Sequence, residues 1–412
     1  MELDPAHDFR VVSGPTLLCR ANHAEHGWER SGPDNLGATM TEGFRIAPYV
    51  EGSWMTKHEG IYYLQYAAPG TVWTSYADGV YSSRSPTSGF TYAPYSPFSY
   101  KLGGFIGGAG HSGTFKDKRG NYWRVTTMVI SVLHKFERRL GIFPAGFDRD
   151  GIMRTDTYLG DYPQFLPGVA RRPLDHNRPD WMLLTRGARA TASSSLDGHS
   201  PELAADDRII TQWSATSGDA GEWLRLDLGE ISTLRAIQVN LGEQEATALA
   251  RSAAIPSRYL VEGSADGTSW RTLLDRRVAE RDMSHAYIEL ARPVRARYLR
   301  ITNHQTGGGG RFAVRDLRAF GWSTIAAPSA PKLLDVRRRD DDRTVTLRWI
   351  RVPRAESYVV RYGIAPTKLY GSVEVGDDST LTLHSLNHGV PYHFTVDAVG
   401  RGGVARGTVT RQ

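Results

Sequence analysis

Residues 49–71 read YVEGSWMTKHEGIYYLQYAAPGT. In the second half of this stretch, after the turn sequence Lys-His-Glu-Gly, large apolar residues alternate with smaller ones. A period of two is typical of a strand with one buried face, and a glycine-containing turn between two such runs is typical of a hairpin. We therefore predict a β-hairpin with strands at residues 53–57 and 61–67.

Glu51 stands where the first predicted strand begins, directly before Gly52, which allows the backbone to turn tightly. The aromatic residues that could exclude water from its carboxyl group are Tyr49, Trp54, Tyr63 and Tyr66. Loss of solvation favours the protonated form of a carboxyl group, so a shielded Glu51 could donate a proton to a leaving group near neutral pH. The alternative is an edge-strand glutamate that lies in water.

A second stretch, residues 114–125 (TFKDKRGNYWRV), repeats the hairpin pattern of residues 54–65. The turn glycines, Gly60 and Gly120, are sixty residues apart, a period that suits one four-stranded blade of a β-propeller. Further strands are expected at residues 79–83, 90–93, 139–143 and 151–155. We predict about two blades and the tail of a third.

The composition favours a soluble, all-β protein. The chain has 412 residues, of which 40% are apolar and 23% charged, with 43 glycines and 21 prolines for tight turns. Neither disorder nor a membrane span is suggested, and the net charge of +6 is too dispersed for a nucleic-acid surface. Cys19 is the only cysteine, so an intrachain disulfide cannot form.

Three units follow one another in the chain. Residues 1–172 carry the blade pattern and end in a proline-rich stretch. Residues 180–321 contain cleanly alternating strands at 221–229, 236–241, 258–262 and 296–302, which predict a jelly-roll sandwich. Residues 331–412 contain strands at 345–349, 357–362, 380–383 and 392–398, which predict a second sandwich.

The first unit resembles the five-bladed β-propeller glycosidases of glycoside hydrolase family 43. The likeness covers about residues 2–163 and includes Glu51-Gly52-Ser53, Tyr62-Tyr63-Leu64, and the segments at 26–30, 108–111 and 136–139. The resemblance implies that Glu51 is the general acid, that an aspartate of the first blade activates water, and that a second aspartate tunes the acid. Asp4, Asp34, Asp78 and Asp161 are available by type, but none stands in the context of that base, so we expect the base to be absent.

Residues expected to contact substrate are Trp28, Arg30, Trp54, Tyr66, His111 and Arg138. An aromatic face stacks against a sugar ring, and charged groups bind its hydroxyls. The resemblance brings His111 to the central channel, near a metal ion or water under the sugar. The alternatives are a structural loop clamp with a Glu29–Arg30 pair, a His111 bonded in the propeller core, and an Arg138 that faces outward.

The second unit resembles a discoidin or coagulation-factor C-type domain, a galactose-binding-like module, through segments at 190–194, 206–213, 223–229, 264–270 and 316–321. That family often holds a structural calcium ion, and Asp206, Asp207, Thr211 and Asp316 occupy the corresponding places. Asp207 stands where the family prefers glycine, and Arg208 adds positive charge, which weakens this prediction. The third unit resembles a fibronectin type III domain and implies no chemistry.

These resemblances predict a glycoside hydrolase that cleaves arabinose-, xylose- or galactose-containing polysaccharide with inversion and needs no cofactor for chemistry. Residues 1–5 lack a signal-peptide pattern, so we expect an internal start in an exported parent protein whose earlier blades are missing. The alternative is a non-catalytic carbohydrate-binding or adhesion protein that acts through the discoidin unit.

Overall fold

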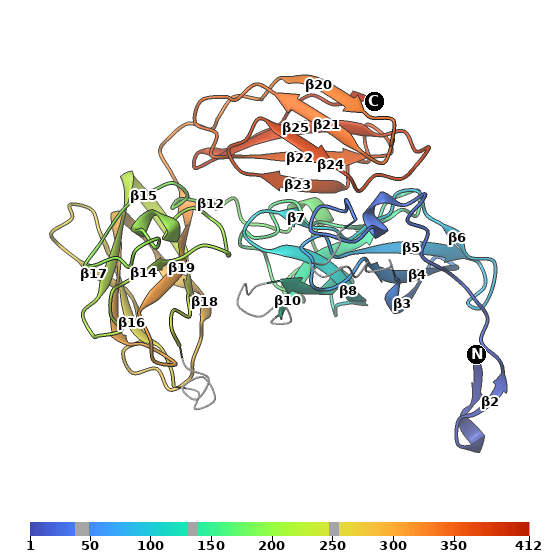
Figure 1. Cartoon of the computed structure of the whole chain (residues 1–412), viewed down its shortest axis with the longest axis horizontal. Helices are drawn as coiled ribbons and strands as arrows, with labels where there is room; N and C mark the ends of the chain where they lie inside the picture. Colours follow the sequence, from blue (N-terminus) through green and yellow to red (C-terminus); the bar gives the residue numbers. More distant parts are fainter. Residues whose placement is uncertain (38–48, 130–137, 247–254, 412) are drawn as a thin grey trace.

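The computed structural model describes residues 1–37, 49–129, 138–246 and 255–411, and these fold almost entirely as β-structure. Three bodies are visible in Figure 1: a pair of sheets from the first third of the chain, a sandwich from the middle and a sandwich from the last third. Short 3₁₀ helices occur at Pro5–His7, Gly27–Glu29, Leu174–His176 and Pro201–Ala204. Within the described ranges, no helix has the length and apolarity needed to cross a membrane.

Two four-stranded antiparallel sheets form the described core of the first body, in a propeller-like arrangement. The first has the order β3-β4-β5-β6 and consists of Glu51–His58, Ile61–Ala68, Ala77–Ser83 and Thr91–Tyr92. The second has the order β8-β9-β10-β11 and consists of Gly107–Lys116, Tyr122–Val129, Arg138–Phe147 and Met153–Thr155. Both predicted hairpins and all four predicted outer strands are present, and Gly60 and Gly120 turn the chain at positive φ.

A buried polar network joins the two sheets. Asp78 of β5 forms an ion pair with Arg124 of β9, and both side chains are almost completely buried. Arg124 also donates hydrogen bonds to Gln65 of β4 and, at 2.7 Å, to the Thr114 hydroxyl of β8. Because each strand alternates its faces, these residues lie on the facing surfaces of the two sheets. The innermost strands β3 and β8 are in contact as a result.

The N-terminal hairpin stands apart from this body. Strands β1 (Glu2–Asp4) and β2 (Arg10–Ser13) pair only with each other, and their side chains are mostly exposed. Figure 1 shows them projecting away from the rest of the molecule. Residues 16–18 form no strand. The existence of a third blade stays a prediction.

The middle body is the expected jelly-roll sandwich. Its long strands β15 (Trp223–Leu241) and β18 (His285–Gln305) bend at bulges and so serve both layers. Around them pair β12 (Met182–Leu183), β13 (Arg189–Ala192), β14 (Trp213–Ser214), β16 (Arg258–Ser264), β17 (Arg271–Asp275) and β19 (Ala313–Trp322). The core between the layers includes Trp213, Leu226 and Ile301.

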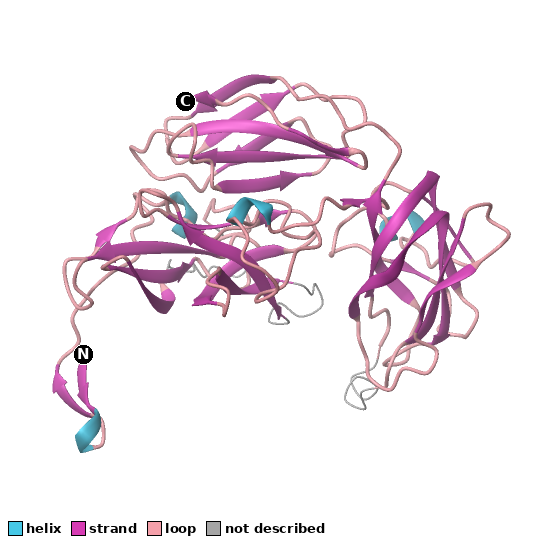
Figure 2. Ribbon diagram, turned by 180° about the vertical axis from the view of Figure 1, so that it is seen from behind, coloured by secondary structure: helices cyan, strands magenta, loops and turns pink. Residues whose placement is uncertain are grey.

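The last body is a two-sheet sandwich, seen from behind in Figure 2. One sheet has the order β20-β21-β24, formed by Leu333–Arg338, Val345–Trp349 and Thr380–Leu383. The other combines β22 (Ser357–Gly363), β23 (Gly371–Val375), β25 (His393–Gly400), β26 (Gly403–Ala405) and β27 (Thr410–Arg411). All four predicted strands are present. The fibronectin type III assignment stays a prediction.

The first and last bodies pack directly against each other. Strand β7 (Leu102–Gly103) of the first unit pairs in parallel with β23, which extends the sandwich sheet by one strand. One hydrophobic core contains Trp28 and Tyr66 from the first unit together with Tyr358 and Phe394 from the sandwich. A domain that acts only as a spacer would share no core with its neighbour. This sandwich therefore packs as part of the same structure as the first body.

Replacing Arg124 by methionine would leave the Asp78 carboxyl group buried without its cation. We expect a loss of about 3–5 kcal/mol in the free energy of unfolding. Burial raises the pKa of Asp78 to about 6, although Arg124 opposes that shift. A carboxyl group whose pKa is higher in the folded protein than in the unfolded chain contributes most to stability at pH values below its unfolded-state pKa. That contribution to stability falls as the pH rises through its folded-state pKa. The loss should therefore be smaller near about pH 5 than near about pH 8.

Urea denaturation at the two pH values measures this difference. Arg149→Met is the matched control, because the Arg149 side chain is 91% exposed, and it should change stability by at most about 0.5 kcal/mol. Equal destabilisation by Arg124→Met at both pH values would contradict the pairing.

Candidate active site

Glu51 is the first residue of β3 and faces the neighbouring innermost strand β8. Gly52 follows with φ +59°, and a Cβ atom there would lie 2.9 Å from the His111 ring. The register of β3 against β4 shifts between Glu51 and Trp54. The glycine and this bulge therefore bring the Glu51 side chain and the His111 ring together from two different sheets.

Tyr76 connects Glu51 to His111. Its hydroxyl group donates a 2.5 Å hydrogen bond to Glu51 Oε1 and lies 3.0 Å from His111 Nδ1, while Glu51 Oε1 and His111 Nδ1 are 3.9 Å apart. Burial, followed by the bond to Glu51, raises the pKa of Tyr76 well above its usual range. The Tyr76 hydroxyl thus stays protonated and donates to the Glu51 carboxyl group.

One side of this cluster is open to solvent. The Glu51 side chain is 33% exposed and the His111 side chain 53% exposed. The water exclusion expected from the sequence is therefore partial. A carboxyl group that is held on one side by Tyr76 and open on the other can reach a ligand.

Asp78 holds the backbone beneath His111. Its Oδ1 atom accepts a 2.8 Å hydrogen bond from the His111 amide, and its other oxygen pairs with Arg124. Ala109 and His111 both have positive φ, at 89° and 50°, a conformation that costs free energy and persists where surrounding contacts enforce it. The network between the sheets therefore supports the position of the His111 ring.

Trp54 supplies an exposed aromatic surface on the same strand as Glu51. Its side chain is 46% exposed, and its indole nitrogen donates a 3.0 Å hydrogen bond to the carbonyl of Thr114. The ring packs beside Gly113, where a Cβ atom would lie 3.6 Å away. Its role in stacking against a sugar stays a prediction.

Three predicted substrate contacts are instead structural. Trp28 is fully buried and donates a hydrogen bond to the Tyr92 hydroxyl. Tyr66 is 1% exposed and donates to Glu29. Arg30 pairs with Asp341 and donates to the carbonyl of His384 in the last body. Trp28 and Tyr66 are buried inside the protein and Arg30 is held by the last body, so the prediction that these three residues contact substrate is wrong.

The alternative of a loop clamp describes the segment better, with different partners. Glu29 accepts hydrogen bonds from Asn22 and Tyr66 and lies 2.8 Å from His26 Nδ1, and Arg30 takes no part in that group. Arg138 begins β10 opposite Val129, and its side chain lies outside the described part of the chain.

The sequence analysis missed Tyr76 and the pairing of Asp78. Tyr76 immediately precedes β5, and its contacts reach 25 residues back and 35 residues forward along the chain. No local pattern marks such a residue. The only available signal was the alternation of β5, which places the side chain of Asp78 on the face opposite that of Ala77 and Gly79.

Each of the four aspartates considered as a general base makes polar contacts with residues other than Glu51. Asp78 is buried against Arg124. Asp161 pairs with Lys101, and both are nearly buried. Asp4 belongs to the N-terminal hairpin and contacts His7, while Asp34 accepts from the Leu36 amide. The absence of the general base stays a prediction.

The residues predicted to hold calcium do not fit a cation. Both oxygens of Asp206 accept from the Thr211 hydroxyl, at 3.0 and 2.8 Å. Asp207 forms ion pairs with Arg186 and Arg318, and Asp316 accepts from the Asp207 amide at 2.8 Å. Calcium needs six to eight oxygen ligands with uncompensated charge. Here guanidinium groups already balance the central carboxylate, so we derive no role for calcium.

Trp28→Ala and Trp54→Ala separate the two roles assigned to tryptophan. We expect Trp28→Ala to lower the free energy of unfolding by about 3–5 kcal/mol, because it empties a packed core. Trp54→Ala should cost less than about 1 kcal/mol, because the ring is half exposed. Chemical denaturation of both variants measures the difference, and similar losses would contradict the assignment.

Comparisons with solved structures return remote likenesses. A protein described as a glycoside hydrolase is 20% identical over 66% of this chain and 60% of that chain, with a TM-score of 0.37, so this chain spans about 60% of its length. A chitosan-binding module of a chitosanase/glucanase from Paenibacillus sp. IK-5 is 23% identical over 34% of this chain and 98% of that chain, with a TM-score of 0.29. A family 89 glycoside hydrolase from Clostridium perfringens is 22% identical over 35% of this chain and 15% of that chain, with a TM-score of 0.29.

No curated protein matches the chain. Two family models do match. Residues 189–317 match the F5/8 type C domain, which agrees with the predicted discoidin unit. Residues 31–153 match the glycosyl hydrolases family 43, and this match includes Glu51, Tyr76 and His111. The first body is therefore similar to a family 43 glycosyl hydrolase domain, and the second to an F5/8 type C domain.

Proposed function

We propose that the protein is a glycoside hydrolase in which Glu51 is the general acid. The family 43 match over residues 31–153 supports this class of activity. The observation that carries the role of Glu51 is its contact with Tyr76, which holds one carboxylate oxygen at 2.5 Å while the side chain stays one-third exposed. The acid thus has a fixed position and an open side.

In the proposed reaction, Glu51 gives its proton to the glycosidic oxygen as the bond to the anomeric carbon breaks. The leaving sugar departs as a neutral alcohol, and Glu51 becomes a carboxylate that the Tyr76 hydroxyl stabilises. Inversion further requires a second carboxylate about 6.5–9.5 Å away to take a proton from the attacking water. This second group is left unassigned.

The substrate proposed is an arabinose-, xylose- or galactose-containing polysaccharide outside the cell. Trp54 offers a ring for stacking, and His111 offers a polar group beside Glu51. The F5/8 type C unit would bind the same polymer and raise its local concentration near the acid.

A second candidate function is carbohydrate binding without hydrolysis. One observation favours it: each of the four aspartates considered as general base is engaged elsewhere. In that case the F5/8 type C unit would hold a glycan and the Glu51 cluster would be inert.

Glu51→Gln should separate these functions. Loss of a general acid lowers kcat/KM by about 10²–10⁴-fold. The loss should be largest for aryl arabinosides, xylosides or galactosides with poor leaving groups and small for 2,4-dinitrophenyl glycosides, which depart without protonation. Steady-state kinetics on both substrate types measure it.

Glu59→Gln is the matched control, because Glu59 lies in the turn of the same hairpin with its side chain 85% exposed, and it should leave the rate unchanged. Glycan binding with no turnover of any of these substrates by the unmodified protein would favour the second candidate. An equal loss of kcat/KM for substrates with good and with poor leaving groups would show that Glu51 is not the general acid.

A further inference from the structure

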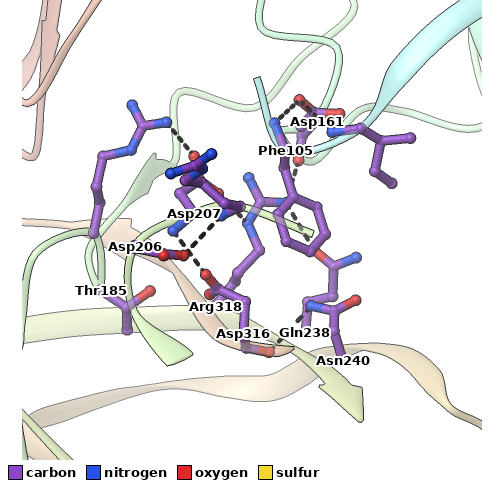
Figure 3. Close-up of polar contacts among 12 residues, drawn as sticks. Phe105, Asp161, Thr185, Asp206, Asp207, Gln238, Asn240, Asp316 and Arg318 are labelled. Atoms are coloured by element: carbon purple, nitrogen blue, oxygen red, sulfur yellow. Dashed lines mark hydrogen bonds and ion pairs between the residues drawn. The ribbon is translucent and has the colours of Figure 1, made fainter. Parts of the chain in front are cut away.

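The loop of the F5/8 type C unit between the 3₁₀ helix Pro201–Ala204 and β14 carries Asp206 and Asp207, which meet Asp316 of β19 at a junction of all three bodies. Figure 3 shows Asp206, Asp207 and Asp316 gathered around the side chain of Arg318, with Phe105 and Asp161 of the first body beside them. We propose that Arg318 and Arg186 take the place of a cation in this loop and fasten the unit to its two neighbours. The unit is then fixed in one orientation without calcium.

Arg318 makes the connection to the first body. It extends from β19, is 1% exposed, and its Nε atom lies 2.9 Å from Asp207 Oδ1. Its Nη1 group donates a 2.9 Å hydrogen bond to the carbonyl oxygen of Asp161. The guanidinium plane also lies 4.5 Å from the centre of the Phe105 ring. A single side chain thus neutralises the loop and contacts the neighbouring body.

Lys101 completes that side of the junction. Its ammonium group pairs with the Asp161 carboxylate at 2.6 Å and donates to the carbonyl oxygens of Gly103 and Ile106. The Asp161 carboxylate also accepts from the Phe105 amide at 2.9 Å. The ring that Arg318 covers is therefore held in place by its own hydrogen-bonded turn.

Arg186 makes the connection to the last body. Its guanidinium group bridges Asp207 of the loop, at 2.5 Å, and Glu374 of strand β23, at 3.1 Å. Arg401 of the last body donates in return to the carbonyl oxygens of Arg186 and Leu228. The two bodies therefore exchange contacts in both directions.

The backbone of the loop suits this arrangement. Asp207 has φ +58°, a left-handed conformation in which glycine is favoured and aspartate is tolerated. An aspartate at this position directs both carboxylate oxygens at arginines, whereas a glycine would remove that carboxylate from both Arg186 and Arg318. A divalent ion placed here would meet two fixed positive charges, and its binding would be unfavourable.

The proposal is tested by calcium dependence in the full chain. For the unmodified protein, we expect the same Tm in millimolar calcium chloride and in EDTA, and no terbium luminescence from this loop. Arg318→Ala should lower the Tm by about 5–10 °C, because it removes one of the two arginines that neutralise the buried Asp207 carboxylate. In that variant calcium should restore part of the Tm, since the oxygen ligands lose their internal cation.

Limited proteolysis of residues 163–180, which connect the first body to the F5/8 type C unit, shows how firmly that unit is docked to its neighbours. We expect faster cleavage in Arg318→Ala and in Arg186→Ala, and no change in Arg292→Ala, which removes an exposed arginine of the same unit. Arg186→Ala gives the same test if Arg318→Ala is insoluble. A calcium-dependent Tm in the unmodified protein, or no calcium response and unchanged cleavage in both variants, would overturn the proposal. Neither readout depends on hydrolysis.

Discussion

The ion pair between Asp78 and Arg124 is the contact on which the candidate site depends. It lies between two sheets that have no backbone hydrogen bonds to each other in the described topology, and it is buried on both sides. A buried pair is costly to desolvate, so it adds little net stability over an apolar contact, but it penalises any arrangement that separates its partners. Since Asp78 also binds the His111 amide, the relative position of the sheets sets the distance between His111 and Glu51.

Buried contacts also fix the three bodies relative to one another. The first and last bodies share an apolar core around Trp28 and a parallel strand pair, which makes them one folding unit. The F5/8 type C unit is attached by the arginines of its acidic loop. A glycan held by that unit would therefore lie at a constant distance from Glu51, whereas a flexible linker would let the unit move.

The sequence pattern predicted the strands well because strand formation depends on residues that are neighbours in the chain. The hairpins around Gly60 and Gly120 and the four strands predicted for each sandwich follow from alternation and turn residues. The residues that surround a side chain in the folded protein cannot be predicted from such a local pattern. Trp28 resembled a sugar platform in sequence, but it packs against Tyr66 and Gly79 of its own unit and shares a core with the sandwich more than 300 residues away. Tyr76, Arg186 and Arg318 were missed for the same reason.

The most direct test of the central claim is a crystal structure of the Glu51→Gln protein with an arabino- or xylo-oligosaccharide bound. The account predicts a glycosidic oxygen within about 3 Å of the side chain at position 51, with a sugar ring over Trp54 and a hydroxyl group near His111. An oligosaccharide bound only to residues 189–317, with no sugar beside position 51, would contradict it.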